Sequence, residues 1–323
     1  MKKPILLHYY ITNRCNSRCT FCDIWKALPK LDAIPADVVT NLKSARNAGC
    51  TFVDFTGGEP LLHPDLPLFL KEAKNQRFIT SVTTNCIDFP KRVSQLAGYV
   101  DLLHFSLDGG TATLHNTIRG TDSFDKVMES IPLALSYNMA PDLLFTYTDE
   151  NIDSFESAYA IAKKNRLIII LDPVFNCDGP DILLLATHRK ARQFSKWKGV
   201  YLNPSHLRLR KIGGNNIDNP ICKAVTSTIV ITPDNCRVLP CYHHAQDELL
   251  LNSGLAAVGH SPEEKNWQAL QGRDSICEGC HINCYFDPSY LYAGIEWSIP
   301  SVLAKARYGW NKYVVYGRKI PKR

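Results

Sequence analysis

The sequence has no long hydrophobic run, no secretory signal, no internal repeat and no low-complexity stretch. Its purely aliphatic runs, such as residues 167–171, are far too short to span a bilayer. Residues 1–4 lead through three aliphatic residues directly into polar ones, which is not the pattern of a signal peptide. The composition excludes wholesale disorder, collagen and coiled coil. We therefore expect a globular, cytoplasmic protein with a large buried core.

Cysteine, by contrast, is abundant, with twelve residues in a chain of 323. Disulfides are rare in cytosolic proteins, so this number indicates metal binding or redox chemistry. The formal charge of +6 is a local feature. Residues 301–323 contain seven basic and no acidic side chains, whereas the other 300 residues carry 30 basic and 31 acidic ones. The basicity therefore belongs to a C-terminal tail, which also contains Tyr308, Trp310, Tyr313 and Tyr316.

Up to about residue 175, short β-rich runs alternate with helical patterns such as residues 36–48 and 66–75. This alternation predicts a parallel α/β architecture, either an open sheet or a barrel, with its chemistry at the carboxyl ends of the strands. Polar and glycine-rich segments do follow these runs. The six strands are expected at residues 5–11, 52–55, 79–83, 102–105, 143–146 and 167–172.

The second half of the chain has a different character. Residues 178–219 look irregular, and residues 228–239 predict a β-hairpin flanked by cysteines. We expect a first domain at residues 1–210, a small cysteine-rich domain at 211–300 and a basic, aromatic tail at 301–323. The tail is interpreted either as a helix that packs onto the small domain or as a surface for an anionic substrate or lipid, with nucleic acid less favoured.

Three cysteines, Cys15, Cys19 and Cys22, directly follow the first predicted strand. A structural zinc site needs four ligands, and no histidine lies within this loop to complete one. Three thiolates on a [4Fe–4S] cluster would instead leave one iron open to a small molecule. The alternative is a zinc loop completed from elsewhere in the chain.

The run from Cys15 to Cys22 resembles the signature of radical S-adenosylmethionine (SAM) enzymes. Over residues 4–175, four further segments follow in that family's order: residues 57–60, 84–85, 106–109 and 115–120. The resemblance implies a partial (β/α)6 TIM-type barrel and reductive cleavage of SAM, bound at the open iron, to a 5′-deoxyadenosyl radical. It also implies that SAM is contacted by Phe21, Gly57, Gly58, Glu59, Asn85, Ser106, Asp108 and Arg119.

These residue types suit the implied contacts. Glycine lets a backbone approach a ligand closely, because it has no Cβ. Glu59 is an acceptor for the ammonium group of SAM, and Arg119 can pair with its carboxylate. In isolation, each has a simpler explanation as a turn, a surface ion pair or a core residue.

Six more cysteines lie in the second half of the chain. Two cysteines that flank the hairpin and two that form a close pair can together make a four-thiolate site for zinc or an iron–sulfur cluster. The arrangement resembles the shortened SPASM extension, called twitch, of radical SAM enzymes. This implies a small C-terminal iron–sulfur domain with one auxiliary [4Fe–4S] cluster. The expected ligands are Cys222, Cys241, Cys277 and Cys280, with Cys284 as a possible replacement for one of them. Cys236 and Cys86 are left as candidate hydrogen donors, although packing explains Cys86 equally well.

The predicted function is a radical SAM oxidoreductase acting on a C–H bond of a small or lipid-like metabolite, for example a tetrapyrrole, terpenoid or sugar. A first strand near residue 5 leaves no room for a leader-binding domain, which disfavours the alternative of a peptide-maturing epimerase or cross-linker. The expected partners are flavodoxin or ferredoxin as reductant and, through the tail, a membrane surface. An alternative of another class is a zinc protein that binds nucleic acid through its tail.

Overall fold

The computed structural model describes residues 3–176, 181–252, 254–255, 259 and 261–320. Within these residues a single sheet has the strand order β10-β9-β8-β1-β2-β3-β4-β5-β6-β7. All neighbouring pairs from β8 to β7 in this order are parallel. The parallel strands are β1 (Leu6–Thr12), β2 (Phe52–Gly57), β3 (Ile79–Thr84), β4 (Leu102–Ser106), β5 (Asp142–Tyr147), β6 (Ile169–Pro173), β7 (Val200–Tyr201) and β8 (Thr228–Ile231).

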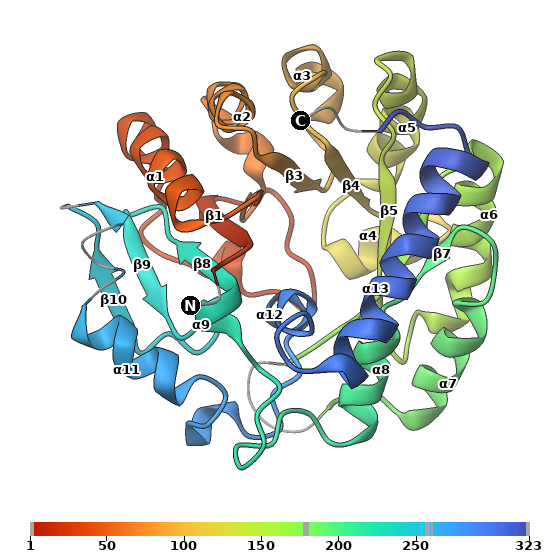
Figure 1. Ribbon diagram of the computed structural model, residues 1–323. Coiled ribbons are helices and arrows are strands. Elements are labelled where there is room, and N and C mark those ends of the chain that lie inside the picture. Colours follow the sequence, from red (N-terminus) through yellow and green to blue (C-terminus); the bar gives the residue numbers. More distant parts are fainter. Residues whose placement is uncertain (1–2, 177–180, 253, 256–258, 260, 321–323) are drawn as a thin grey trace.

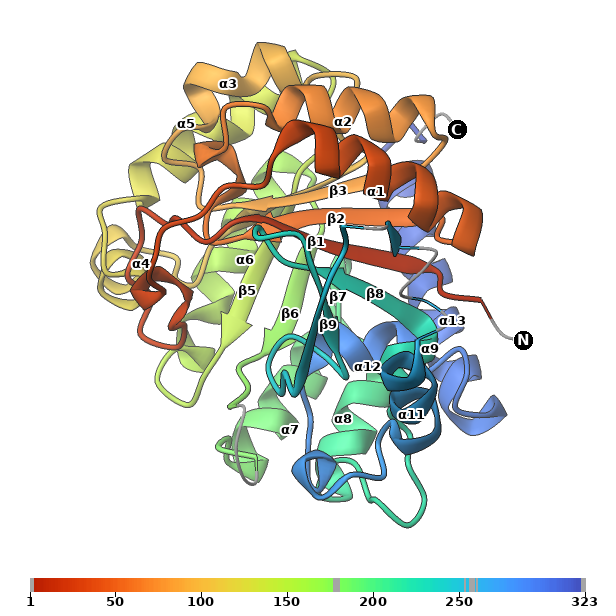
Figure 2. The ribbon, with the colours of Figure 1, turned by 90° about the vertical axis from the view of Figure 1, so that its left-hand side faces the viewer.

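Helices cover the outer face of this curved sheet, as in a barrel that does not close (Figure 1). Figure 2 shows α1, α2 and α3 lying along the strands β1 to β3. The outer helices are α1 (Pro35–Ala48), α2 (Leu66–Asn75), α3 (Phe89–Leu96), α4 (Ala112–Arg119), α5 (Phe124–Ser136), α6 (Phe155–Asn165), α7 (Leu185–Phe194) and α8 (Pro204–Lys211). The fold is therefore α/β with a partial TIM-type barrel, as predicted, and β1 to β6 are the six predicted strands.

The strands have a two-residue period that separates an apolar outer face from a polar inner face. Alternate residues such as Leu7, Tyr9 and Phe55 are fully buried in one large hydrophobic core beneath the helices. The intervening residues, for example His8 and Asp54, face the barrel interior, where His8 Nδ1 lies 3.2 Å from Asp54 Oδ2. The apolar residues thus hold the layers together, and the polar residues line the lumen.

Prolines in the first turn mark the start of several helices, including α1, α2 and α3. Proline is tolerated there because the first backbone N–H groups of a helix have no intrahelical acceptor. Residues 178–219, expected to be irregular, contain α7, β7 and α8 among the residues that the structure describes. This expectation was wrong because α7 and α8 are rich in basic residues, and most of the side chains that they bury are polar or small.

The predicted hairpin is present as β8 and β9 (Cys236–Leu239), and β10 (Asp247–Leu250) adds a third strand. It does not form a separate sheet, because β8 pairs with β1 and extends the sheet of the barrel. The remaining helices of this half are α9 (Ala224–Ser227), α11 (Pro262–Leu270), α12 (Asn283–Ser289) and α13 (Ile295–Gly309). The sheet therefore runs across the expected boundary near residue 210, and the three-part division of the chain stays a prediction.

Helix α12 lies in the opening between β1 and the second half of the barrel (Figure 1). At its start, Asn283 Nδ2 donates to Asp172 Oδ1 and to Pro173 O, at 3.0 and 2.7 Å, at the end of β6. On the other side, the Tyr285 ring lies edge-on to His8 of β1, with 5.9 Å between ring centroids. The first turn of α12 thus bridges the gap that the sheet leaves open.

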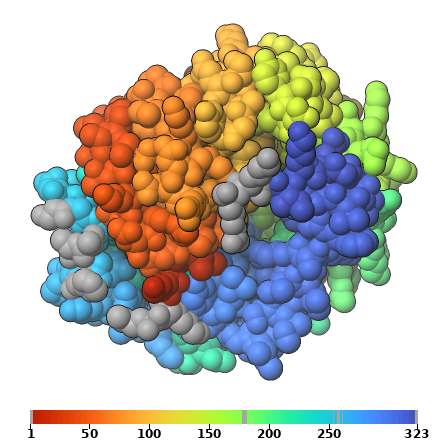
Figure 3. Space-filling model, turned by 45° about the horizontal axis from the view of Figure 1, so that its top comes forward, coloured from red at the N-terminus to blue at the C-terminus, as the bar shows by residue number. Residues whose placement is uncertain are grey.

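The C-terminal tail packs against the barrel, and Lys305 also pairs with Asp287 of α12 at 2.9 Å. In Figure 3 it forms one continuous surface with the helices of the second half of the barrel. Trp310–Val315 forms a π-helix after α13, and Tyr308 and Lys312 both donate to Asp142 Oδ2, at 2.6 and 2.8 Å. Ile295, Ile299 and Leu303 of α13 and Trp310 of the π-helix remain more than half exposed, and contact with a membrane surface stays a prediction. In the described part of the chain, no helix has the length and apolarity needed to cross a bilayer.

Replacing Lys312 by methionine is expected to lower the free energy of unfolding by about 3 kcal/mol, because it leaves Asp142 as a buried charge without its cation. Asp142 and Lys312 are 0% and 3% exposed. The matched control is Lys319→Met on the exposed part of the tail, which should change stability by less than about 0.5 kcal/mol. Chemical denaturation of both variants measures the difference, and equal midpoints would show that the tail does not anchor the barrel.

Candidate active site

The cysteine loop after β1 is held in place by backbone hydrogen bonds from two directions. Gly58 N and Glu59 N, just after β2, donate to Thr12 O and Arg14 O at 2.9 and 2.8 Å. From within the loop, Arg18 N donates to Arg119 O at 3.0 Å, at the end of α4. The loop that carries Cys15, Cys19 and Cys22 is therefore fixed at the carboxyl ends of the strands, where the sequence predicts the chemistry.

The glycines of this region are needed for contact with the loop itself. A Cβ on Gly57 would lie 1.9 Å from Thr12 O, and one on Gly58 would lie 2.1 Å from Arg14 O. Gly120, which ends α4 with a φ of +59°, has the same function, since its Cβ would lie 2.4 Å from Arg18 O. The close approach first attributed to a ligand is, in this structure, made by the chain.

Glu59 and Asn85 connect the ends of β2 and β3 to the cysteine loop. Glu59 is 3% exposed and its carboxylate accepts from Leu61 N and Asn85 N, at 3.1 and 2.8 Å. Burial raises the pKa of Glu59 to about 7. The Asn85 amide donates to Asn16 Oδ1 at 2.7 Å and to Ser17 Oγ at 2.8 Å. Glu59 thus has a structural task in addition to the predicted contact with an ammonium group.

Asp108 and Arg119 form a buried ion pair beside the loop, with 2.6 Å between Asp108 Oδ2 and Arg119 Nε. Arg119 Nη1 also donates to Cys19 Sγ at 3.6 Å, and the guanidinium lies 5.7 Å from the centre of the Phe21 ring. Ser106, at the end of β4, is buried in the same region. Gly57, Gly58, Glu59, Asn85 and Arg119 therefore contact the cysteine loop, Asp108 is linked to it through Arg119, and the contacts of these residues with SAM stay predictions.

The loop thiols are chemically suited to a metal cluster. Burial, and less strongly the charges of Cys19 and Cys22, raise the pKa of Cys15 to about 11; burial also raises that of Cys22. Buried thiols facing one another become thiolates readily only when a metal supplies positive charge. None of the eleven cysteines in the described residues is in a disulfide.

The second set of cysteines surrounds a small enclosed cavity between the hairpin and α12. Its lining includes Cys222, Cys241, Cys277 and Cys280 and is otherwise mostly apolar. Burial, and then the charges of Cys280 and Cys277, raise the pKa of Cys222 well above its usual range. The four thiols converge from two separate segments, as the spacing predicts, and their donor chemistry fits an iron–sulfur cluster.

The spacing of both sets suits a polynuclear cluster better than a single zinc ion. Around one tetrahedral zinc ion with Zn–S bonds of about 2.3 Å, thiolate sulfurs lie about 3.8 Å apart. Among the described residues, the group with three possible ligand atoms within 4.8 Å of one another is Asp234, Cys236 and Glu248, which belongs to neither set. Among the described residues, neither cysteine set thus brings three thiol sulfurs within 4.8 Å of one another, whereas one zinc ion would hold them about 3.8 Å apart.

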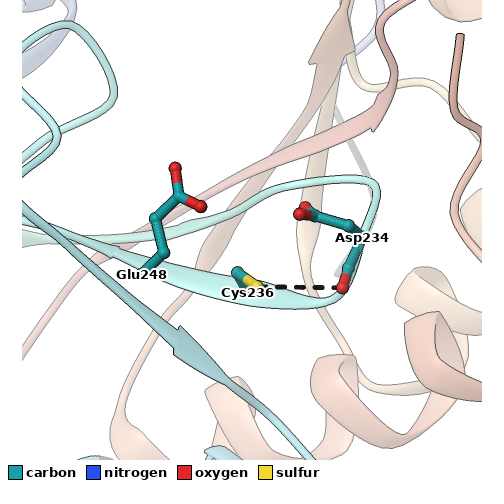
Figure 4. A group of neighbouring side chains, drawn as sticks. All are labelled: Asp234, Cys236 and Glu248. Carbon is teal, nitrogen blue, oxygen red and sulfur yellow. Dashed lines mark hydrogen bonds between the residues drawn. The ribbon is translucent and has the colours of Figure 1, made fainter. Parts of the chain in front are cut away.

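The remaining cysteines occupy three different environments. Cys236 lies on the hairpin next to two exposed carboxylates, with its thiol 3.8 Å from Asp234 O (Figure 4). Cys86 is fully buried in the large core beneath the helices, although it follows the end of β3. Cys284 does not line the cavity of the other four and interacts with Asp172 and Asp54. These positions argue against the hydrogen-donor roles expected for Cys236 and Cys86. Cys177 lies outside the described residues.

The polar side chains that line the barrel lumen were not predicted as part of the site. Asp172, at the end of β6, is half-buried, and desolvation raises its pKa to about 7 despite the nearby Arg210. His104 of β4 is likewise half-buried, and desolvation lowers its pKa. Polar residues at alternate positions of otherwise apolar strands are the signal that could have indicated this lining.

Comparison with known proteins identifies the family. Residues 9–162 match the Radical SAM superfamily. GTP 3′,8-cyclase of Clostridium acetobutylicum is 28% identical over 162 residues, which cover 46% of this chain and 49% of that protein. GTP 3′,8-cyclase of Chlorobaculum tepidum is 32% identical over 133 residues, 39% of either chain. The chain thus spans about half or less of the length of the curated relatives it matches.

Two solved structures share the fold over most of the chain. Streptococcus suis SuiB bound to S-adenosylmethionine has a TM-score of 0.70 at 15% identity and covers 88% of this chain and 74% of its own. The structure of anSMEcpe with bound AdoMet has a TM-score of 0.65 at 16% identity, over 98% and 96% of the two chains. Together with the cysteine loop, the match over residues 9–162 shows that this part of the chain is a radical SAM domain, and the two solved structures show the same fold over most of the chain.

Proposed function

We propose that this protein cleaves SAM reductively and uses the resulting radical to modify a C–H bond of a small, polar metabolite. The observation that carries this proposal is the clamped loop of Cys15, Cys19 and Cys22 at the open end of a polar barrel. A flavodoxin or ferredoxin is the proposed electron donor. One auxiliary cluster on Cys222, Cys241, Cys277 and Cys280 completes the proposed cofactor set.

When bound, a [4Fe–4S] cluster supplies the electron that breaks a carbon–sulfur bond of SAM, which gives methionine and a 5′-deoxyadenosyl radical. The protein's share is positioning and exclusion of water. The backbone bonds around Gly58 and Gly120 hold the three thiols, and the pair of Asp108 and Arg119 places a cation beside Cys19. Arg119 is the residue proposed to pair with the carboxylate of SAM.

The proposed substrate is polar because the lumen is polar. His8, Asp54 and Asp172 are lumen residues, and each is a hydrogen-bonding side chain. The aromatic tail does not argue for a lipid-like substrate, because Tyr308 and Lys312 bind at the start of β5, away from the cysteine loop. The curated relatives are named for a reaction of GTP, which also supports a small-molecule substrate for this chain. Whether the reaction is a net oxidation depends on the second set of cysteines.

Anaerobic reconstitution and assay test this function. The protein is expected to be brown, to bind about eight irons per chain, four for each cluster, and to form 5′-deoxyadenosine from SAM with dithionite as reductant. Iron analysis, visible absorption and chromatography of the nucleoside measure these properties. A colourless protein with stoichiometric zinc and no 5′-deoxyadenosine would contradict the proposal and favour the zinc alternative.

A further inference from the structure

The first turn of α12 brings one thiol into the barrel lumen. Cys284 follows Asn283, which is hydrogen-bonded to Asp172 of β6, and precedes Tyr285, which packs edge-on against His8 of β1. The residues whose charges act most strongly on its thiol are Asp172 and Asp54, on opposite sides of the sheet. Cys284 therefore lies on the inner side of the sheet between β2 and β6, and the charge of Cys241 acts on its thiol less strongly than those of the two aspartates.

Two buried polar atoms beside Cys284 have no hydrogen-bond partner among the described residues. They are His8 Nε2 and Asn283 Oδ1, and the two side chains are 9% and 4% exposed. Leaving such a group unsatisfied costs about 1–3 kcal/mol, so these two atoms indicate that the lumen takes a ligand that supplies the missing bonds. A ligand that satisfies them carries hydrogen-bonding groups of its own, such as hydroxyl or amino groups.

The thiol of Cys284 is not accounted for by the auxiliary cavity. The other four cysteines of this region line that cavity, and they already make a complete four-thiolate set. Burial, and then the charges of Asp172 and Asp54, raise the pKa of the Cys284 thiol to about 12. Its S–H bond is thus present at neutral pH, and an S–H bond is weaker than an alkyl C–H bond.

From this geometry we infer that Cys284 donates a hydrogen atom to a carbon radical of a polar, hydroxyl- or amino-bearing substrate bound in the lumen against His8 and Asn283. This inference rests on the proposed function. Cys284 thus replaces Cys236 and Cys86, which do not lie in the lumen, as the proposed hydrogen donor.

The low-potential reductant supplies the electrons that this reaction consumes. The 5′-deoxyadenosyl radical takes a hydrogen atom from a substrate carbon and becomes 5′-deoxyadenosine. The substrate radical takes the hydrogen atom of the Cys284 thiol, which becomes a thiyl radical. One electron from the low-potential reductant and one proton from solvent restore the thiol. Each turnover therefore consumes one SAM and two electrons and returns the substrate carbon to its original oxidation state, with inversion where the hydrogen arrives from the opposite face.

The experiment uses SAM alone, in D2O, with dithionite as the reductant and no added thiol. Without substrate, the carbon radical in the lumen is the 5′-deoxyadenosyl radical, and the exchangeable Cys284 thiol carries deuterium. We expect deuterated 5′-deoxyadenosine from the wild type and from the control Cys236→Ala, and a deuterated fraction at least several-fold lower from Cys284→Ala. Mass spectrometry measures this fraction, and iron analysis shows whether each variant keeps both clusters.

The outcomes separate this inference from the function on which it rests. An unchanged deuterated fraction in Cys284→Ala, or no deuterium in the wild-type product, overturns the role of Cys284. Loss of about four irons from Cys284→Ala also overturns it, because the residue would then be a cluster ligand. A wild type that forms no 5′-deoxyadenosine overturns the proposed function, and this inference with it.

Discussion

Replacing Cys19 by alanine is expected to abolish the formation of 5′-deoxyadenosine and to remove about four irons per chain, because two thiolates do not hold a [4Fe–4S] cluster. Cys19 is the most firmly placed of the three loop cysteines. It is 9% exposed, and its sulfur accepts from Arg119 Nη1 at 3.6 Å. No other described cysteine is in position to replace it, since the second set lines a separate cavity behind α12. Iron analysis and quantification of 5′-deoxyadenosine after anaerobic reconstitution measure both effects.

The matched control for this variant is Cys50→Ala. Cys50 is fully buried in the large core beneath the helices, so it undergoes the same chemical change without touching either cysteine set. We expect it to keep about eight irons and full SAM cleavage, at a modest cost in stability. If the Cys19 variant still cleaves SAM while the Cys50 variant behaves like the wild type, the assignment of the cluster to this loop is wrong.

The layout of the barrel could be predicted because local and tertiary preferences agree there. The β-rich runs at residues 52–55 and 79–83 are β2 and β3 in the structure, and the helical pattern at residues 66–75 is α2 with the same bounds. Helices α7 and α8 were missed because basic residues dominate both, and tertiary contacts rather than an apolar stripe define them.

The chemistry of the site was predictable in part. Cysteine spacing indicates which thiols can meet a cluster, but it does not show which way a short helix presents its first turn. For this reason the sequence left Cys284 as an alternative ligand, and its place facing Asp172 emerged only from the fold. Similarly, the tail was interpreted as a helix packed on the small domain or as a surface for an anionic substrate or lipid, and neither interpretation included the internal ion pair of Lys312 with Asp142. Local sequence patterns do not predict such pairings between residues that are far apart in the chain.

Replacing Cys241 by alanine is expected to remove about four irons per chain while leaving the formation of 5′-deoxyadenosine largely intact. Cys241 is 7% exposed and lines the enclosed cavity together with three other thiols. Its loss opens that four-thiolate set but does not change the hydrogen bonds that hold the cysteine loop after β1. Loss of iron from one cysteine set should therefore leave the other set loaded, as expected for two separate clusters and not for one shared site.

The control is Cys236→Ala, five residues earlier on the same hairpin. Cys236 is as well buried as Cys241, but it lies beside Asp234 and Glu248 and not in the cavity. We expect this variant to keep about eight irons, so that any loss in Cys241→Ala comes from a ligand and not from damage to the hairpin. Electron paramagnetic resonance of the reduced proteins adds a second measurement, because the signal that responds to SAM should persist in both variants. Equal iron contents in the two variants, or loss of the SAM-responsive signal from Cys241→Ala alone, would contradict an independent auxiliary cluster on these four cysteines.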